Sequence, residues 1–232
     1  MAKAIEVKNF TKKYKDVIAL DDVTMNINLG KITGVMGPNA SGKTTLLKAL
    51  AGFIRPDNGE ILFAGEKINN FDKNKLAYLP DEKFLSDYQS IKEAGLMYKD
   101  FFADFDDDLF EKTLEYFHLN PQAKIAGLSK GDYKKIGLCL NLARNADLYI
   151  FDEPLDGLDP ISTAKIIDLI IDKMNDEKTF IISTHQIANI ENLFDEAIFL
   201  SRGSIHDFGD AKNIREHHNM DLADYYDEIY LG

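Results

Sequence analysis

The stretch Gly37-Pro38-Asn39-Ala40-Ser41-Gly42-Lys43-Thr44 decides the fold class of this 232-residue chain. It matches the pattern GxxxxGK[ST], in which two glycines enclose four residues and Lys and a hydroxyl residue follow. The apolar run Ile32 to Met36 precedes it and predicts a short buried strand, and a helical pattern that ends at Gly52 follows it. A glycine-rich loop between a strand and a helix is the context of a phosphate-binding P-loop.

The chemistry of this loop follows from its residue types. Glycines allow the backbone to curl so that several N–H groups point at phosphate oxygens, and the helix N-terminus adds its positive end. Lys43 can reach the β and γ phosphates, and the Thr44 hydroxyl can ligate Mg²⁺. The pattern indicates a nucleotide but not a reaction. The predicted nucleotide-binding residues of the loop are Gly37, Pro38, Asn39, Ala40, Ser41, Gly42, Lys43, Thr44 and Thr45.

Short apolar runs alternate with helical patterns along the rest of the chain. Helical spacing at residues 161–174 lies between two such runs, and buried strands that alternate with helices predict a parallel α/β sheet. Strand signals with alternating polarity open the chain. Residues 82–144 lack strand runs of this kind and predict a helical insertion, and residues 211–232 predict a helical or frayed tail. The predicted strands are 4–10, 23–29, 32–36, 148–151, 180–183 and 197–200.

A second motif places two carboxylates after a buried strand. The four apolar residues Leu148 to Phe151 precede Asp152 and Glu153, and ligands bind at this carboxyl edge of a parallel sheet. Asp152 can hold Mg²⁺ or its water, and Glu153 can polarise a water for attack on the γ phosphate. Without the P-loop, a solvated acidic turn would explain the same residues nearly as well.

Composition and charge exclude several classes of protein. Hydrophobic residues make up 45% of the chain and charged residues 28%, which is typical of a globular protein. The formal net charge of −12 disfavours nucleic acid as a partner, because phosphate contacts need clustered Lys and Arg. The single cysteine, Cys139, permits no internal disulfide and fits a reducing cytoplasm. No secretory signal and no membrane-spanning stretch is expected.

The segment Leu128-Ser129-Lys130-Gly131-Asp132 adds a third signal, a Ser N-cap with a Gly beside it ahead of another helical pattern. Together with the P-loop and the two carboxylates, it resembles the nucleotide-binding subunit of ATP-binding cassette (ABC) transporters, whose signature is LSGGQ. The resemblance covers about residues 4–204. It implies one ABC ATPase domain over residues 1–232: a P-loop α/β core with an antiparallel β portion (residues 1–81 and 145–210), a helical subdomain (82–144) and a tail (211–232).

The resemblance also implies roles for residues outside the two first motifs. Tyr14 corresponds to the aromatic residue that stacks on adenine, and Asp81 stands where the family has its Q-loop glutamine and could ligate Mg²⁺. Asp159 corresponds to the D-loop aspartate, and His185 to the switch histidine beside the γ phosphate. The implied catalytic residues are Lys43, Glu153 and His185; Thr44, Asp81 and Asp152 are the implied Mg²⁺ ligands.

In this family two chains sandwich two ATP molecules, so Ser129 and Gly131 are expected to act on the nucleotide of the opposite chain. The implied cofactors are ATP and Mg²⁺, and the implied partners are a polytopic membrane permease and a second copy or a paralogous ATPase. The short path from Lys43 to Asp81, its YLPD sequence and the lack of a C-terminal regulatory domain favour a bacterial exporter ATPase at the cytoplasmic face of the membrane. An importer ATPase, a soluble ABC ATPase of iron–sulfur assembly, and a P-loop kinase are the alternatives; the kinase would leave Ser129, Asp159 and His185 unexplained.

Overall fold

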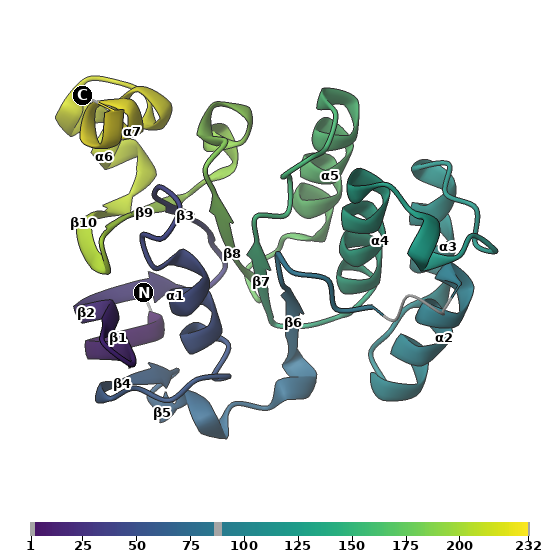
Figure 1. Ribbon diagram of the computed structural model, residues 1–232, viewed down its shortest axis with the longest axis horizontal. Coiled ribbons are helices and arrows are strands. Elements are labelled where there is room, and N and C mark those ends of the chain that lie inside the picture. Colours follow the sequence, from purple (N-terminus) through teal and green to yellow (C-terminus); the bar gives the residue numbers. More distant parts are fainter. Residues whose placement is uncertain (1–2, 86–89, 232) are drawn as a thin grey trace.

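The computed structural model describes residues 3–85 and 90–231, and it contains two β-sheets with one helix between them. Residues 86–89, which fall in the predicted helical insertion, and residues 1, 2 and 232 lie outside the described residues. The smaller sheet is antiparallel and has the strand order β2-β1-β4-β5 (Figure 1). Its strands are β1 (Lys3–Tyr14), β2 (Val17–Asn28), β4 (Asn58–Phe63) and β5 (Glu66–Lys67).

The larger sheet carries the strands that deliver the motifs, in the order β10-β9-β3-β8-β7-β6. Strands β9, β3, β8, β7 and β6 are parallel, and β10 joins the edge as an antiparallel strand. This arrangement confirms the predicted parallel α/β sheet. The strands are β3 (Ile32–Met36), β6 (Leu76–Leu79), β7 (Leu148–Asp152), β8 (Thr179–Thr184), β9 (Glu196–Ser201) and β10 (Ser204–Asp210).

The central strands β3, β7 and β8 are buried along their whole length because helices or the second sheet cover both of their faces. In β7, Leu148 and Ile150 pack with α1 (Lys43–Leu50) and the smaller sheet, whereas Tyr149 and Phe151 pack into the core on the opposite side. Burying such apolar side chains contributes on the order of 2 kcal/mol each. The P-loop and the carboxylates therefore lie at the ends of strands that are buried along their whole length.

Helices make up the region between β6 and β7, apart from short 3₁₀ turns and isolated bridges among the described residues. They lie to one side of the larger sheet, where α4 is nearest to β6 (Figure 1). Helix α2 begins at the capping box of Ser90 and Glu93, which satisfies two orphan N–H groups. The helices are α2 (Ile91–Phe101), α3 (Asp107–Tyr116) and α4 (Lys130–Leu142), and α5 (Pro160–Lys173) follows β7.

The C-terminal segment forms two packed helices, α6 (Ala211–His218) and α7 (Leu222–Leu231), so the helical one of the two predicted alternatives, a helical or a frayed tail, is observed. Leu222 and Tyr225 are buried in the larger core, and the Tyr230 hydroxyl donates to the Leu200 carbonyl at 3.0 Å. Apolar and tyrosine side chains on one helix face give this acidic segment a surface to bury. In the helical region, Phe102 and Phe105 pack against the larger core, whereas Phe101 is 72% exposed.

Candidate functional site

The P-loop lies between β3 and α1 as its sequence predicts, and its backbone needs left-handed geometry at Ala40 (φ 63°) and Gly42 (φ 111°). A Cβ at position 42 would lie 2.6 Å from the carbonyl oxygen of Ala19, so both the dihedral angle and the space require glycine there. The Gly203 N–H donates to the Ser41 carbonyl at 2.8 Å and ties the loop to the turn between β9 and β10. The loop is thus held from outside as well as by its own turns.

The Lys43 ammonium lies across this loop. It donates to the Gly37 carbonyl at 2.8 Å and to the Pro38 carbonyl at 3.3 Å, and it lies 3.3 Å from Oε1 of Glu153. The Lys43 side chain is only 7% exposed, so its charge is compensated by these oxygens. A phosphate group at the loop would offer the same ammonium a stronger, charge-assisted set of acceptors.

The two carboxylates at the end of β7 have different environments. Ser183, on β8, donates from its hydroxyl to Oδ1 of Asp152 at 2.6 Å and accepts from the Glu153 N–H at 2.9 Å. Burial raises the pKa of Asp152, although hydrogen bonds from Ser183 and Thr44 act in the opposite direction. Oδ2 of Asp152 is buried and has no hydrogen-bond partner among the described residues. A buried, unpaired carboxylate oxygen near the Thr44 hydroxyl fits an Mg²⁺ site.

Glu153 combines unusual backbone geometry with a histidine partner. Its φ of 47° is uncommon for a residue with a side chain and directs the carboxylate toward both Lys43 and His185. Oε2 of Glu153 lies 2.8 Å from Nδ1 of His185 and also accepts from the His185 backbone N–H at 3.3 Å. An ionised carboxylate only accepts, so a hydrogen bond in this contact requires a proton on Nδ1.

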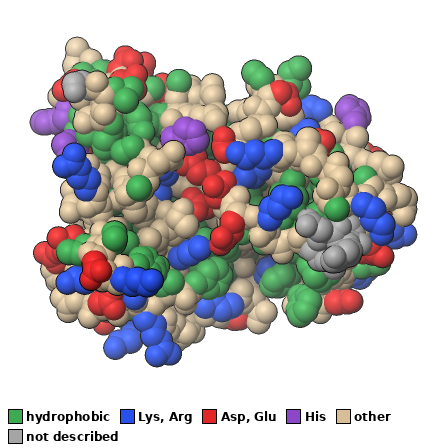
Figure 2. Space-filling model, in the orientation of Figure 1, with side chains coloured by type: hydrophobic (Ala, Val, Ile, Leu, Met, Phe, Trp, Pro, Cys, Tyr) green, Lys and Arg blue, Asp and Glu red, His purple; other side chains and the backbone are tan. Residues whose placement is uncertain are grey.

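A pocket of about 290 Å³ beside the P-loop brings several of the predicted site residues together. Figure 2 shows acidic side chains gathered near the centre of one face of the molecule, with Lys and Arg next to them. The lining includes Asp81, Glu153 and P-loop residues, together with three apolar residues that the sequence analysis missed. The lining residues are Val17, Ile18, Ala19, Asn39, Ala40, Gly42, Lys43, Thr44, Thr45, Asp81 and Glu153.

Tyr14, Ser129, Gly131 and Asp159 do not line this pocket. Tyr14 is 45% exposed at the end of β1, where its Cα pairs with that of Val17 at the pocket wall. Val17, Ile18 and Ala19 belong to β2, which begins six residues before the predicted strand. The apolar sequence of these three residues, close to Tyr14 in the chain, was the signal from which this wall of the pocket could have been predicted. The proposed adenine contact of Tyr14 stays a prediction.

The Ser129 segment meets the segment after Glu153 within the same chain. Ser129 caps α4, accepting from the Asp132 N–H at 3.1 Å and donating to the Asp132 carboxylate at 2.8 Å. The Lys130 ammonium lies 2.6 Å from Oδ2 of Asp156, and a Cβ on Gly131 would lie 3.0 Å from the Gly157 carbonyl oxygen. Asp159 caps α5 through Ser162. The Ser129 segment and the Asp159 segment therefore each begin a helix at the surface, and neither lines the pocket of its own chain.

Asp81 lies at the pocket, but its carboxylate is paired with a lysine that the sequence analysis did not single out. Oδ1 of Asp81 lies 2.9 Å from the ammonium of Lys134, which is on α4. The neighbouring Tyr133 hydroxyl accepts from the backbone N–H groups of Phe84 at 2.7 Å and Leu85 at 2.8 Å. Helix α4 thus contacts the 81–85 segment through two consecutive side chains.

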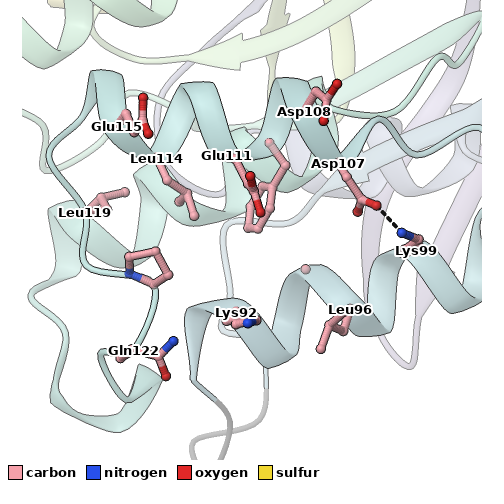
Figure 3. A pocket seen from close by; sticks show the side chains of 13 residues that line it. Lys92, Leu96, Lys99, Asp107, Asp108, Glu111, Leu114, Glu115, Leu119 and Gln122 are labelled. Atoms are coloured by element: carbon pink, nitrogen blue, oxygen red, sulfur yellow. Dashed lines mark hydrogen bonds and ion pairs between the residues drawn. The ribbon is translucent and has the colours of Figure 1, made fainter.

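A larger pocket of about 670 Å³ lies outside the P-loop region, between α2 and α3 (Figure 3). Leu96 and Leu114 lie among Lys92, Glu111 and other charged side chains there, and Lys99 on α2 forms an ion pair with Asp107 on α3. This pocket contains no residue of the three motifs.

Among the helices in the described ranges, none is long and apolar enough to cross a bilayer.

A P-loop at the carboxyl edge of a parallel sheet, together with Asp152 and Glu153 at the end of β7, which β8 separates from β3, defines a P-loop NTPase. The antiparallel sheet, the helical region and the Ser129 segment further restrict which family of P-loop NTPases the chain can belong to. The ABC transporter family model matches residues 20–156, and the chain belongs to the ABC transporter family as its ATP-binding, ATP-hydrolysing subunit.

Relatives span almost the whole chain. An uncharacterized ABC transporter ATP-binding protein of Methanocaldococcus jannaschii is 32% identical over 92% of this chain and 80% of its own length. The lipopolysaccharide export system ATP-binding protein LptB of Haemophilus influenzae is 26% identical over 98% of this chain and 97% of its own. The manganese transport system ATP-binding protein MntB of Listeria monocytogenes is 30% identical over 85% of this chain and 87% of its own length.

Solved structures share the fold. One titled as an ATP-binding subunit of an ABC transporter has a TM-score of 0.83, 24% identity and 95% coverage of both chains. A dimeric ATP-binding cassette bound to ADP and Pi has a TM-score of 0.79 and 24% identity over 89% of this chain and 98% of its own. The predicted fold class, a P-loop core with an inserted helical region, is confirmed.

Proposed function

We propose that this ATPase subunit energises export of a substrate through a separate membrane permease, at the cytoplasmic face of the membrane. The observation that carries the ATPase part is the set of contacts made by Glu153, which lines the P-loop pocket with Lys43, lies 3.3 Å from its ammonium and lies 2.8 Å from Nδ1 of His185. Asp152 precedes Glu153 at the end of β7 and accepts from Ser183. The export direction is supported by the relative LptB, named for an export system, which aligns over nearly the full length of both chains. MntB, named for manganese transport, aligns over less of this chain and represents the import alternative.

Each group of site residues has its own role in ATP hydrolysis. Lys43 and the loop N–H groups bind the phosphates, and Thr44, Asp152 and Asp81 hold Mg²⁺. When bound, Mg²⁺ neutralises charge that develops on the phosphate oxygens. Glu153 accepts a proton from the attacking water, and the His185 contact at 2.8 Å keeps the carboxylate oriented. Ser183 orients the Asp152 carboxylate by donating to it, and it holds the backbone of Glu153 by accepting from its N–H.

A complete site needs a second chain in this proposal. Ser129 and Gly131 lie at a helix start, do not line the pocket of their own chain and would bind the γ phosphate of a partner. Asp159 lies at the start of α5 and would face the same interface. One chain carries both halves, so a homodimer is the simplest assembly and a paralogous ATPase is the alternative.

Permease docking is proposed on the helical region. Leu96 on α2 is 50% exposed and lines the pocket between α2 and α3 (Figure 3). Phe101, the last residue of α2, is 72% exposed. Exposed apolar side chains beside a hollow are typical of an interface. The region is joined to the nucleotide pocket through the Asp81 segment.

The test is to tag the chain at low expression, solubilise the membranes gently and identify what copurifies. A stoichiometric polytopic membrane protein supports the proposal, and reconstitution of both proteins in vesicles then reports the direction of ATP-dependent transport. Inward movement of the substrate would replace export by import. A pool with only soluble partners would overturn the transporter assignment in favour of an assembly ATPase, with the nucleotide site unchanged.

A further inference from the structure

The Lys134 side chain is buried at the boundary between the helical region and the nucleotide pocket. It comes from the second turn of α4 and is 4% exposed. Its ammonium lies 2.9 Å from Oδ1 of Asp81 and 3.4 Å from the backbone carbonyl oxygen of Asp152. Both partners belong to the nucleotide site, although Lys134 itself does not line the pocket.

Charge balance explains why a lysine is tolerated in this place. Asp81, Asp152 and Glu153 bring three carboxylates to one region that must also accept polyphosphate. Lys43 lies against Glu153 from α1, and Lys134 lies against Asp81 from α4. An ammonium taken out of water needs such a partner, and breaking a buried pair on one side is more costly than replacing both members.

The ion pair of Lys134 and Asp81 also links helix α4 to the nucleotide pocket. Ser129, which caps α4, and Lys134 are on one rigid helix, and Tyr133 on the same turn binds the N–H groups of Phe84 and Leu85. The side chain of Asp81 is half exposed, whereas the Lys134 side chain that contacts it is buried in the protein. A movement of α4 would therefore move the Asp81 carboxylate.

We propose that Lys134 is a positioning residue that acts through Asp81: its ammonium holds and neutralises this carboxylate, and so permits tight binding of Mg²⁺-ATP. The inference rests on the proposed nucleotide site and adds to it a residue from the helical region. Without the ammonium, Asp81 becomes an uncompensated negative charge beside a polyanionic ligand. Without Asp81, Lys134 becomes a buried charge with only a carbonyl contact.

A double-mutant cycle of Lys134→Gln and Asp81→Gln tests the coupling. The cycle is made in the Glu153→Gln background so that ATP is not consumed during binding measurements. We expect Lys134→Gln alone to raise the Kd of Mg²⁺-ATP roughly tenfold, and less than about threefold when Asp81 is already Gln. In the nucleotide-free protein, we expect Asp81→Gln to lower the Tm by about 5 °C and the added Lys134→Gln to restore most of it.

The matched control is the pair of Lys75 and Asp147, which has a similar separation of 3.0 Å but lies exposed at the surface. The cycle of Lys75→Gln and Asp147→Asn should show almost no coupling in either readout. Additive effects of Lys134→Gln and Asp81→Gln on the Kd would overturn the proposal, and so would coupling in the Tm alone, which indicates a purely structural pair. If the parent protein bound no Mg²⁺-ATP, the proposed nucleotide site would fail, whereas coupling in the Tm would still verify the contact.

Discussion

Glu153 joins His185 and Lys43 through its two carboxylate oxygens: Oε2 lies 2.8 Å from Nδ1 of the imidazole ring, and Oε1 lies 3.3 Å from the ammonium. The left-handed backbone of Glu153 makes this bridge between β8 and the P-loop possible. Non-glycine residues in that conformation are strained, and such strain concentrates at functional sites.

Glu153→Gln should bind ATP and hydrolyse it slowly. The amide keeps the size and the contact distance to His185 but cannot accept the proton of an attacking water. We expect kcat to fall by about 10²–10⁴-fold, with little change in the affinity for ATP. Single-turnover hydrolysis and equilibrium binding measure the two quantities. Hydrolysis at the wild-type rate would contradict the assignment of Glu153 as the base.

His185→Ala should reduce kcat because Glu153 would keep only the backbone N–H contact at 3.3 Å on Oε2. We expect a loss of roughly 10²-fold in kcat and a smaller change in ATP affinity. His206→Ala is the matched control, since His206 is exposed on β10 and outside the pocket. Equal effects of the two substitutions in steady-state ATPase assays would remove His185 from the mechanism.

Asp152→Asn should change how stability depends on pH. Burial raises the pKa of Asp152 in the folded protein, so between the unfolded and folded values the folded state binds more protons. The free energy of unfolding contributed by this group is therefore largest at low pH and decreases as pH rises through the folded pKa. In the absence of nucleotide and Mg²⁺, we expect the variant to lose this decrease and to have a higher Tm at neutral pH.

Thermal unfolding from about pH 3.5, below the ordinary pKa of an Asp carboxyl, up to about pH 8 measures this effect. Asp100→Asn serves as the control, because Asp100 is exposed at the end of α2 and does not line the P-loop pocket. An unaltered pH dependence in Asp152→Asn would show that the carboxyl group is not the source.

Mixed dimers should reveal whether Ser129 acts across the interface. Ser129→Asp keeps a good N-cap for α4 but places a negative charge at the phosphate, and Lys43→Ala weakens the P-loop. Each variant alone should lose ATPase activity. A mixture should recover up to about a quarter of the wild-type activity if chains associate at random, because heterodimers then contain one intact site. No gain on mixing would mean that Ser129 serves the P-loop of its own chain.

Gly42→Ala should disable the P-loop through backbone geometry. The φ of 111° disfavours a side chain, and the new Cβ would lie 2.6 Å from the Ala19 carbonyl oxygen. We expect a loss of at least about 1–3 kcal/mol in stability or a rearranged loop with weak ATP binding. Gly65→Ala is a useful comparison, because it also has a positive φ but no atom within 4 Å of the added Cβ. Normal ATP binding by Gly42→Ala would contradict the strain argument.

Local patterns in the sequence determined much of the fold. The P-loop, the apolar strands β3, β7, β8 and β9, and the helices α1, α3, α4 and α5 follow from apolar spacing, caps and glycine positions over short distances. The weaker strands β4, β5, β6 and β10 went unrecognised. Their stability comes from pairing with strands distant in the chain, as when β6 pairs with β7.

The site divides in the same way. Local patterns predicted Lys43, Asp152 and Glu153 as site residues, because each follows a buried strand or a glycine loop, and the resemblance to the family added His185. Only the tertiary structure placed Val17 at the pocket, put Lys134 against Asp81 and packed the tail through Leu222. Contacts between residues far apart in the chain depend on how helices and sheets pack, and no spacing within a single segment encodes that packing.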